Sequence, residues 1–334
     1  MPVVLERIFA AMKYPSHVLV LGAGTWALPA AGFDLAFPLD CSLGESCFIQ
    51  QYIDRDAGPG AQDFTCGPLV YDGHEGTDFA LPTLADMKKG VAVKAAASGI
   101  VKGARDGVAD VAVNDPAAPP LDGRDCGNGV LIDHGEGWQT QYCHMKQGSI
   151  TLSPGDPVLA GETLGLVGLS GNTEFPHLHV SVRKNDVEID PFDPDNTLNC
   201  GTAAPQLWAD PIAYRPGGIV GLGIATEVPA FETILEGLPS PQSMKSDAPA
   251  IVLWAHLFGG RAGDVLVLSV TSPDGAQLFD EMITLEKNQA RAFRALGKRL
   301  TSAAWPLGAY QSEAILFRDG TEVDRAVLGF TIVP

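Results

Sequence analysis

The feature that most restricts the fold is a repeated pattern of short apolar runs separated by Gly, Pro and Asp. Residues 130–133 and 177–182 are examples in the first half, and residues 265–270 and 326–333 in the second. Short runs with many β-branched residues are typical of strands. Only residues 285–300 leave an amphipathic helix open as an alternative. The pattern therefore predicts a mainly β protein.

Stretches rich in Pro, Gly and Ala divide the strand-like regions. Residues 104–128 have the composition of a long surface loop, and residues 202–250 contain a second such stretch. Because a chain of 334 residues exceeds one average domain of roughly 100–200 residues, we expect two domains. We predict a first domain at 33–202, a linker at 203–220 and a smaller, immunoglobulin-like β-sandwich at 221–334.

The N-terminus has the pattern of a secretory signal. Residues 17–32 contain no Asp, Glu, Lys or Arg and end in Ala30-Ala31-Gly32. This apolar run is shorter than the ~20 residues that a membrane-spanning helix needs. We predict a signal peptide over residues 1–32, no stable membrane insertion, and a periplasmic or secreted protein. A buried N-terminal helix or strand is the alternative.

The charge balance excludes several classes of partner. Asp and Glu number 40 against 22 Lys and Arg, which gives a formal net charge of -18. A nucleic-acid-binding protein needs a basic face, so no nucleic-acid partner is expected. The same acidity disfavours adsorption to anionic membranes.

The six cysteines are an even number, as expected for structural disulfides in an exported protein. A cysteine-based zinc site is the alternative, but the chain contains no Cys-x-x-Cys. The positions favour one pairing among the many that six cysteines allow. That pairing is Cys41–Cys200, Cys47–Cys66 and Cys126–Cys143.

Candidate metal ligands lie in two short motifs. Alternate side chains of a strand share a face, so His177 and His179 point the same way, which suggests a metal or proton-transfer site. In the other motif, Gly76 permits a tight turn that brings His74 close to Asp78. With one histidine of the pair, these residues supply two imidazoles and a carboxylate. Three protein ligands leave an open position, as a catalytic zinc site requires.

A third motif is Tyr142-Cys143-His144. The period of a strand places Tyr142 and His144 on one face and Cys143 on the other. We therefore expect His144 to face the site and Cys143 to turn away toward a disulfide. Glu75, inside the first motif, is expected to be exposed and without a catalytic role.

Taken in order, the three motifs resemble a known family. The sequence has His74-Glu-Gly-Thr-Asp78, then Tyr142-Cys-His144, then Pro-His177-Leu-His179. This order resembles that of the lysostaphin-type (LytM-like) zinc metalloendopeptidases of peptidase family M23, which cut peptide bridges in peptidoglycan. The resemblance covers about residues 70–195.

The resemblance implies an antiparallel β catalytic domain and a role for each motif residue. It implies that His74, Asp78 and His179 bind Zn²⁺ and that His144 and His177 are catalytic. A zinc-activated water then attacks a peptide cross-link of peptidoglycan, so the substrate is a peptidoglycan peptide.

The sequence departs from the family pattern at three places. Met145 replaces a usual Leu, Phe175 stands where Gly is common, and the loop 104–128 is longer. None of these removes a ligand or a catalytic position. His134 and His256 are expected to be structural.

Two functions other than a zinc peptidase are alternatives for this set of residues. Some relatives of this fold have lost zinc ligands and serve as non-catalytic modules that activate other cell-wall hydrolases, but all five site positions are present here. A non-haem iron oxygenase uses a similar ligand set, but it needs a different motif order. A cell-wall polymer or another protein is a possible partner of the C-terminal domain.

Overall fold

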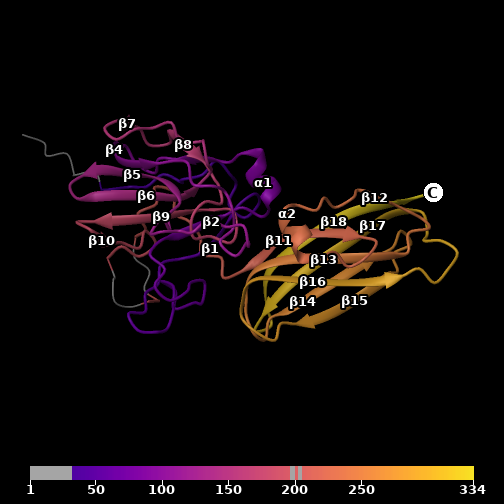
Figure 1. Ribbon diagram of the computed structural model, residues 1–334. Helices are drawn as coiled ribbons and strands as arrows, with labels where there is room; N and C mark the ends of the chain where they lie inside the picture. Colours follow the sequence, from indigo (N-terminus) through magenta and orange to yellow (C-terminus); the bar gives the residue numbers. More distant parts are fainter. Residues whose placement is uncertain (1–31, 196–199, 202–204) are drawn as a thin grey trace, which may run out of the picture. The chain divides into compact units, whose positions relative to one another are not determined.

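Strands dominate the computed structural model, which describes residues 32–195, 200–201 and 205–334 (Figure 1). The mainly β prediction is confirmed. The predicted signal peptide, residues 1–32, lies outside the described residues except for Gly32. Within the described part, no helix is both long and apolar enough to span a membrane.

The main sheet of the first part has eight strands in the order β1-β2-β9-β6-β5-β4-β7, with β10 paired to β9. Its neighbouring strands are antiparallel. The strands are β1 (Phe48–Gln51), β2 (Thr77–Ala80), β4 (Gly99–Arg105), β5 (Asn128–Gly135), β6 (Trp138–Met145), β7 (Pro157–Val158), β9 (His177–Lys184) and β10 (Val187–Glu188). The predicted antiparallel architecture is therefore present, and the histidine pair lies at the start of a central strand.

Smaller elements surround this sheet. Strands β3 (Ala92–Lys94) and β8 (Thr163–Leu166) form a separate two-stranded sheet. Helix α1 (Leu84–Lys89) begins after Thr83, whose side chain accepts a hydrogen bond from the backbone N–H of Asp86. Residues 106–127 connect β4 to β5 without a helix or strand, so the predicted loop at 104–128 is present except at its ends, which belong to the two strands.

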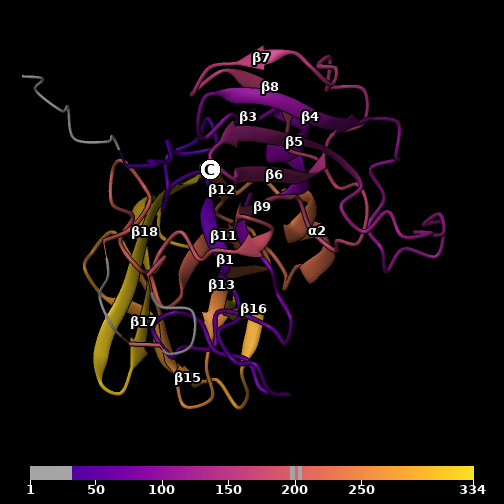
Figure 2. The ribbon, with the colours of Figure 1, turned by 90° about the vertical axis from the view of Figure 1, so that its left-hand side faces the viewer.

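The second part consists of two sheets. One has the order β11-β13-β16, and the other has the order β12-β18-β17-β14-β15, in which β12 and β18 are parallel. In Figure 2, β13 and β16 are drawn in orange and β17 and β18 in yellow. The elements are β11 (Gly218–Ala225), α2 (Phe231–Glu236), β12 (Ser243–Lys245), β13 (Ala250–Gly260), β14 (Val265–Thr271), β15 (Gln277–Thr284), β16 (Gln289–Arg299), β17 (Gly308–Arg318) and β18 (Thr321–Val333). Leu253 from one sheet and Leu268 from the other share a single buried core. Burial of apolar side chains between the sheets holds this part together.

The amphipathic helix considered as an alternative for residues 285–300 is wrong. These residues contain β16, which pairs with β13 from Gly260↔Gln289 to Ala250↔Arg299. Every residue of β13 is buried, so its backbone polar groups need partners that a neighbouring strand supplies. Strand β11 begins at Gly218, before the predicted start of the second domain at residue 221. The domain boundaries and the immunoglobulin-like class stay predictions.

The disulfides differ in part from the predicted pairing. The Cys126–Cys143 pair is confirmed, but the other two predicted pairs are wrong. The bonds are Cys41–Cys47 and Cys66–Cys200. The physical reason is a tight turn at Gly44, whose backbone N–H donates to the carbonyl of Cys47 over 2.7 Å. This turn reverses the chain, and Cys66 is then left to pair with Cys200.

Candidate active site

Two adjacent strands and the loop before them bring together three side chains that could hold a metal ion. Asp78 on β2 is directly opposite His179 on β9, and His74 lies four residues before Asp78. His179 Nδ1 is 2.9 Å from Asp78 Oδ1. His74 Nε2 is 3.2 Å from Asp78 Oδ1 and 3.1 Å from His179 Nδ1. These side chains form the one group of three or more His, Cys, Asp or Glu within the described ranges whose ligand atoms lie close enough to hold a metal ion.

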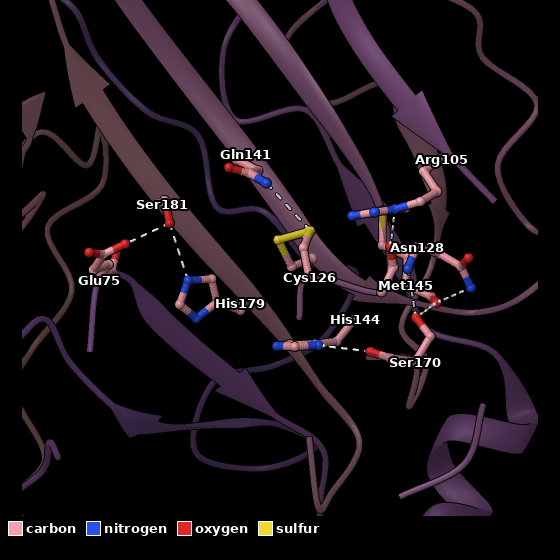
Figure 3. The surroundings of a disulfide bond; sticks show 12 residues. Glu75, Arg105, Cys126, Asn128, Gln141, His144, Met145, Ser170, His179 and Ser181 are labelled. Carbon is pink, nitrogen blue, oxygen red and sulfur yellow. Dashed lines mark hydrogen bonds between the residues drawn. A yellow bond between two sulfur atoms is a disulfide. The ribbon is translucent and has the colours of Figure 1, made fainter. Parts of the chain in front are cut away.

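The far nitrogen of each imidazole is held by a hydrogen bond. His74 Nδ1 lies 2.6 Å from the carbonyl oxygen of Tyr52 and donates to it. His179 Nε2 lies 3.1 Å from Ser181 Oγ, and the Ser181 hydroxyl donates to the carbonyl oxygen of Glu75 (Figure 3). These bonds assign the tautomers, so the unprotonated nitrogens face Asp78. Such outer hydrogen bonds orient histidine ligands and fix their tautomers at metal sites.

The charge of Asp78 dominates the electrostatics of the group. Burial opposes ionisation of Asp78, but the neighbouring His74 and His177 hold the pKa of the carboxyl well below its usual value. Burial likewise opposes protonation of His74, but the Asp78 carboxylate outweighs it and raises the imidazole pKa. A buried carboxylate that stays ionised next to two imidazoles is a site that favours a cation.

Two further histidines lie beside this group. The rings of His144 and His177 have their centroids 4.7 Å apart, and both side chains are buried. His144 Nδ1 donates to the carbonyl oxygen of Ser170 over 2.8 Å (Figure 3). His177 Nδ1 lies 3.0 Å from the carbonyl oxygen of Phe175 and 3.1 Å from Thr173 Oγ1. In His144, Nε2 is the nitrogen left for chemistry, whereas His177 Nε2 lies 3.4 Å from Asp78 Oδ1.

Burial determines the protonation of His144. Its removal from water, together with the nearby His177 and His179, lowers the pKa of His144 well below the usual value for histidine. A neutral imidazole with a protonated Nδ1 keeps the lone pair of Nε2 available to accept a proton.

The prediction that Cys143 turns away from the site is wrong. Cys143 and His144 both line the same cleft, whereas Tyr142 points to the other side and its hydroxyl accepts from the backbone N–H of Ala96. The reason is the backbone of His144, whose φ of 61° interrupts the alternation of the strand. The disulfide of Cys143 with Cys126 therefore lies beside the histidines (Figure 3).

His74, His144 and His179 line an open cleft of about 250 Å³. Asp125 and Cys126 contribute to its wall, so the end of the long loop lines the cleft. Tyr71 and Arg183 are further wall residues. Glu75 is exposed in the cleft, as expected.

His134 and His256 lie outside this group. The ring nitrogens of His134 lie 2.8 Å from the carbonyl oxygen of Ser98 and 2.8 Å from Thr140 Oγ1. His256 is buried in the second part of the chain on β13. Both placements fit the structural roles expected for them.

Sequence reasoning missed the residues that hold the site in place. Ser181 was detectable, because it lies two residues after His179 on the same strand and therefore shares its face. The carbonyl groups of Tyr52, Ser170 and Phe175 carry no sequence signal, because every residue has a carbonyl.

Residues 72–191 match the family model described as peptidase family M23. The matched segment contains all five site residues and excludes the second part of the chain.

Curated proteins similar to this chain include two that are named as endopeptidases. The DD-carboxypeptidase/endopeptidase Mpg of Neisseria meningitidis is 31% identical over 120 residues, which are 35% of this chain and 22% of that protein. The peptidoglycan DD-endopeptidase ShyA of Vibrio cholerae is 34% identical over 106 residues, which are 32% of this chain and 19% of that protein. The chain thus spans about a fifth of the length of these relatives.

Solved structures similar to the chain include two catalytic domains. The catalytic domain of lysostaphin from Staphylococcus simulans is 24% identical with a TM-score of 0.26, and the match covers 38% of this chain and 84% of that one. The catalytic domain of EnpA from Enterococcus faecalis is 26% identical with a TM-score of 0.29, covering 43% and 96%.

Proposed function

Because residues 72–191 match the model of peptidase family M23, we propose that this protein is a zinc metalloendopeptidase that hydrolyses peptide cross-links of peptidoglycan. The observation that carries the proposal is the convergence of His74, Asp78 and His179 beside two further histidines whose Nδ1 atoms are each held by a carbonyl oxygen. The name of one relative, the peptidoglycan DD-endopeptidase, supports the substrate class.

The three converging side chains fit a zinc ion. Two imidazole lone pairs and a carboxylate oxygen point at one another across 2.9 to 3.2 Å. Such an arrangement is unfavourable unless a cation or a proton lies between the groups. His, His and Asp are a donor set that zinc accepts, and three protein ligands leave the open position of a catalytic site. When bound there, zinc supplies a Lewis acid that polarises a carbonyl oxygen and acidifies water.

We assign the proton transfers to His144 and His177. Each has its Nδ1 committed to a carbonyl oxygen, so Nε2 exchanges the proton. One imidazole takes a proton from the attacking water, and the other stabilises the developing oxyanion or protonates the leaving amine. The hydrogen bonds to Ser170 and Phe175 keep the two rings oriented for these steps.

The proposal includes export and a two-part organisation. Three disulfides, Cys41–Cys47, Cys66–Cys200 and Cys126–Cys143, favour an oxidising compartment such as the periplasm or the cell exterior. We retain a catalytic domain at 33–202, a linker at 203–220 and an accessory domain at 221–334 as part of the proposal.

Digestion of purified sacculi tests this function. We expect the zinc-loaded protein to convert cross-linked muropeptides into single ones and to leave the glycan strands intact, as seen by chromatography and mass spectrometry after the treated sacculi are digested with a muramidase. A chelator should abolish this loss of cross-links, and zinc should restore it. Binding to sacculi without loss of cross-links would instead support the non-catalytic module that activates other hydrolases.

A further inference from the structure

Two features of this chain have no role in the proposed reaction. One is Phe175, which stands where Gly is common in the resembling family, and the other is the second part of the chain. The two features meet at the Phe175 ring, which also lies against His177. Residues Asp34–Pro334 form one compact unit, so the contacts that join these features lie within a single body.

Phe175 contacts His177 in two ways. Its carbonyl oxygen lies 3.0 Å from His177 Nδ1, and its ring stacks on the imidazole with centroids 4.5 Å apart and an angle of 26° between the planes. A glycine at this position retains the carbonyl but has no ring. The stacking is therefore specific to this chain, and it covers a face of an imidazole whose Nδ1 is already held.

Arg291 on β16 lies over the Phe175 ring. The carbon of its guanidinium group is 4.7 Å from the ring centroid, within the range of a cation–π interaction. The neighbouring residue, Ala290, accepts a hydrogen bond of 2.8 Å from Gln50 Nε2 on β1. The start of β16 is thus fixed against the main sheet at one residue and contacts Phe175 at the next.

We propose that Arg291 is a positioning residue, which holds the Phe175 ring against His177 and so orients this histidine for proton transfer. The inference rests on the proposed function, because that function assigns a proton transfer to His177. It assigns the second part of the chain a role in catalysis in addition to any role in binding. Arg291 does not contact the metal-binding group, so its loss should leave metal binding intact.

Kinetics of substitutions at both residues test the proposal. Because small displacements of catalytic groups cost up to about 10²-fold in rate, we expect Arg291→Ala and Phe175→Gly each to lower kcat by about tenfold or more. The KM and the zinc content should stay unchanged. Arg291→Lys keeps a cation over the ring and should recover most of the loss.

Arg294→Ala is the matched control. Arg294 lies on the same strand, but its guanidinium group bonds to Phe293 and Gln289 of that strand. This variant should retain the kcat of the wild type. Thermal melts of all variants identify any that lose kcat through unfolding.

A readout that needs no substrate separates this inference from the proposed function. The ring of Phe175 shifts the NMR signal of the His177 Cε1 proton, so Arg291→Ala should move that signal and Arg294→Ala should not. If Arg291→Ala moves the signal but the wild-type protein cleaves no cross-links, the positioning is supported and the proposed function is rejected. An unmoved signal together with an unchanged kcat in Arg291→Ala overturns the positioning.

Discussion

The two parts of the molecule bury polar side chains for different purposes. Among the described residues of 205–334, the buried polar side chains are His256, Asp264 and Ser312. Asp264 pairs with Arg318, and the Ser312 hydroxyl donates to the carbonyl of Leu328, so both secure neighbouring chain segments. In residues 32–195, four buried or half-buried histidines instead converge on one carboxylate.

The two parts differ in where the burial of polar groups serves a functional site. Burying polar groups costs free energy unless each group finds a partner. In the first part, each site histidine has one nitrogen hydrogen-bonded and the other directed at the site. In the second part, the sheets close on an apolar core. The first part therefore adds the histidine site to structural polar pairs such as Arg55 with Asp190, whereas the described second part has no such group of converging ligands.

Replacement of a catalytic histidine should give the largest effect. His144→Ala removes a proton-transfer group, which typically contributes about 10²–10⁴-fold to the rate. We expect a loss of that size in sacculus digestion, with zinc retained near the wild-type level by elemental analysis. Unchanged digestion would show that the histidines beside the carboxylate are structural, as in the second part.

Removal of the disulfide beside the site should follow in size. The Cys126–Cys143 bond closes a loop over a sequence separation of 17 residues, and a bond of this span typically stabilises a protein by about 3 kcal/mol. The double variant Cys126→Ser, Cys143→Ser should lose about this much in denaturant unfolding. It should also lose activity, because the His144 N–H donates to the carbonyl of Cys126. Full activity at a temperature well below its melting point would contradict this link.

Acid should expose the cost of the unpaired histidine in the second part. In the described structure His256 Nε2 has no hydrogen-bond partner, and burial, with a smaller contribution from Arg291, lowers the pKa of His256 to about 4. Because the folded state disfavours protonation, stability is complete above pH ~6.5 and falls as the pH drops from there toward 4. The full loss from this residue is about 3 kcal/mol.

The variant His256→Leu isolates that contribution. Its unfolding free energy should decline less steeply than that of the wild type between pH 6.5 and 4. Parallel curves for the two proteins would show that His256 does not titrate on unfolding.

The smallest effect concerns the outer hydrogen bond of a metal ligand. Ser181→Ala removes the acceptor of His179 Nε2, and losses of such partners typically lower metal affinity about 10–100-fold. Competition with a chromophoric chelator measures this change. Ser312→Ala, a serine of the second part, is the control and should leave zinc affinity unchanged.

The sequence allowed the strands and the order of the site motifs to be predicted. Alternating apolar residues and the spacing of His177 and His179 are local signals. The pairing of the cysteines depends on the turn at Gly44, and the facing of Cys143 depends on the positive φ of His144. Both are set by backbone geometry that residue types do not encode directly.

The helix alternative for residues 285–300 failed for a related reason. An isolated amphipathic pattern fits either period when it is short. Residues 289–299 form a strand because the fully buried strand β13 pairs with them through backbone hydrogen bonds. Contacts between segments that are distant in the sequence, such as Arg291 with Phe175, likewise cannot be predicted from local sequence patterns.

Metal content and peptide cleavage measured on the same samples test the central claim most directly. Wild type and Asp78→Ala are dialysed against zinc, freed of excess metal, analysed for zinc and incubated with sacculi. We expect about one zinc per chain in the wild type, as for a single three-ligand site, with loss of cross-linked muropeptides from the sacculi, and neither in the variant. Equal zinc and equal cleavage in both proteins would contradict the claim that His74, Asp78 and His179 form the catalytic metal site.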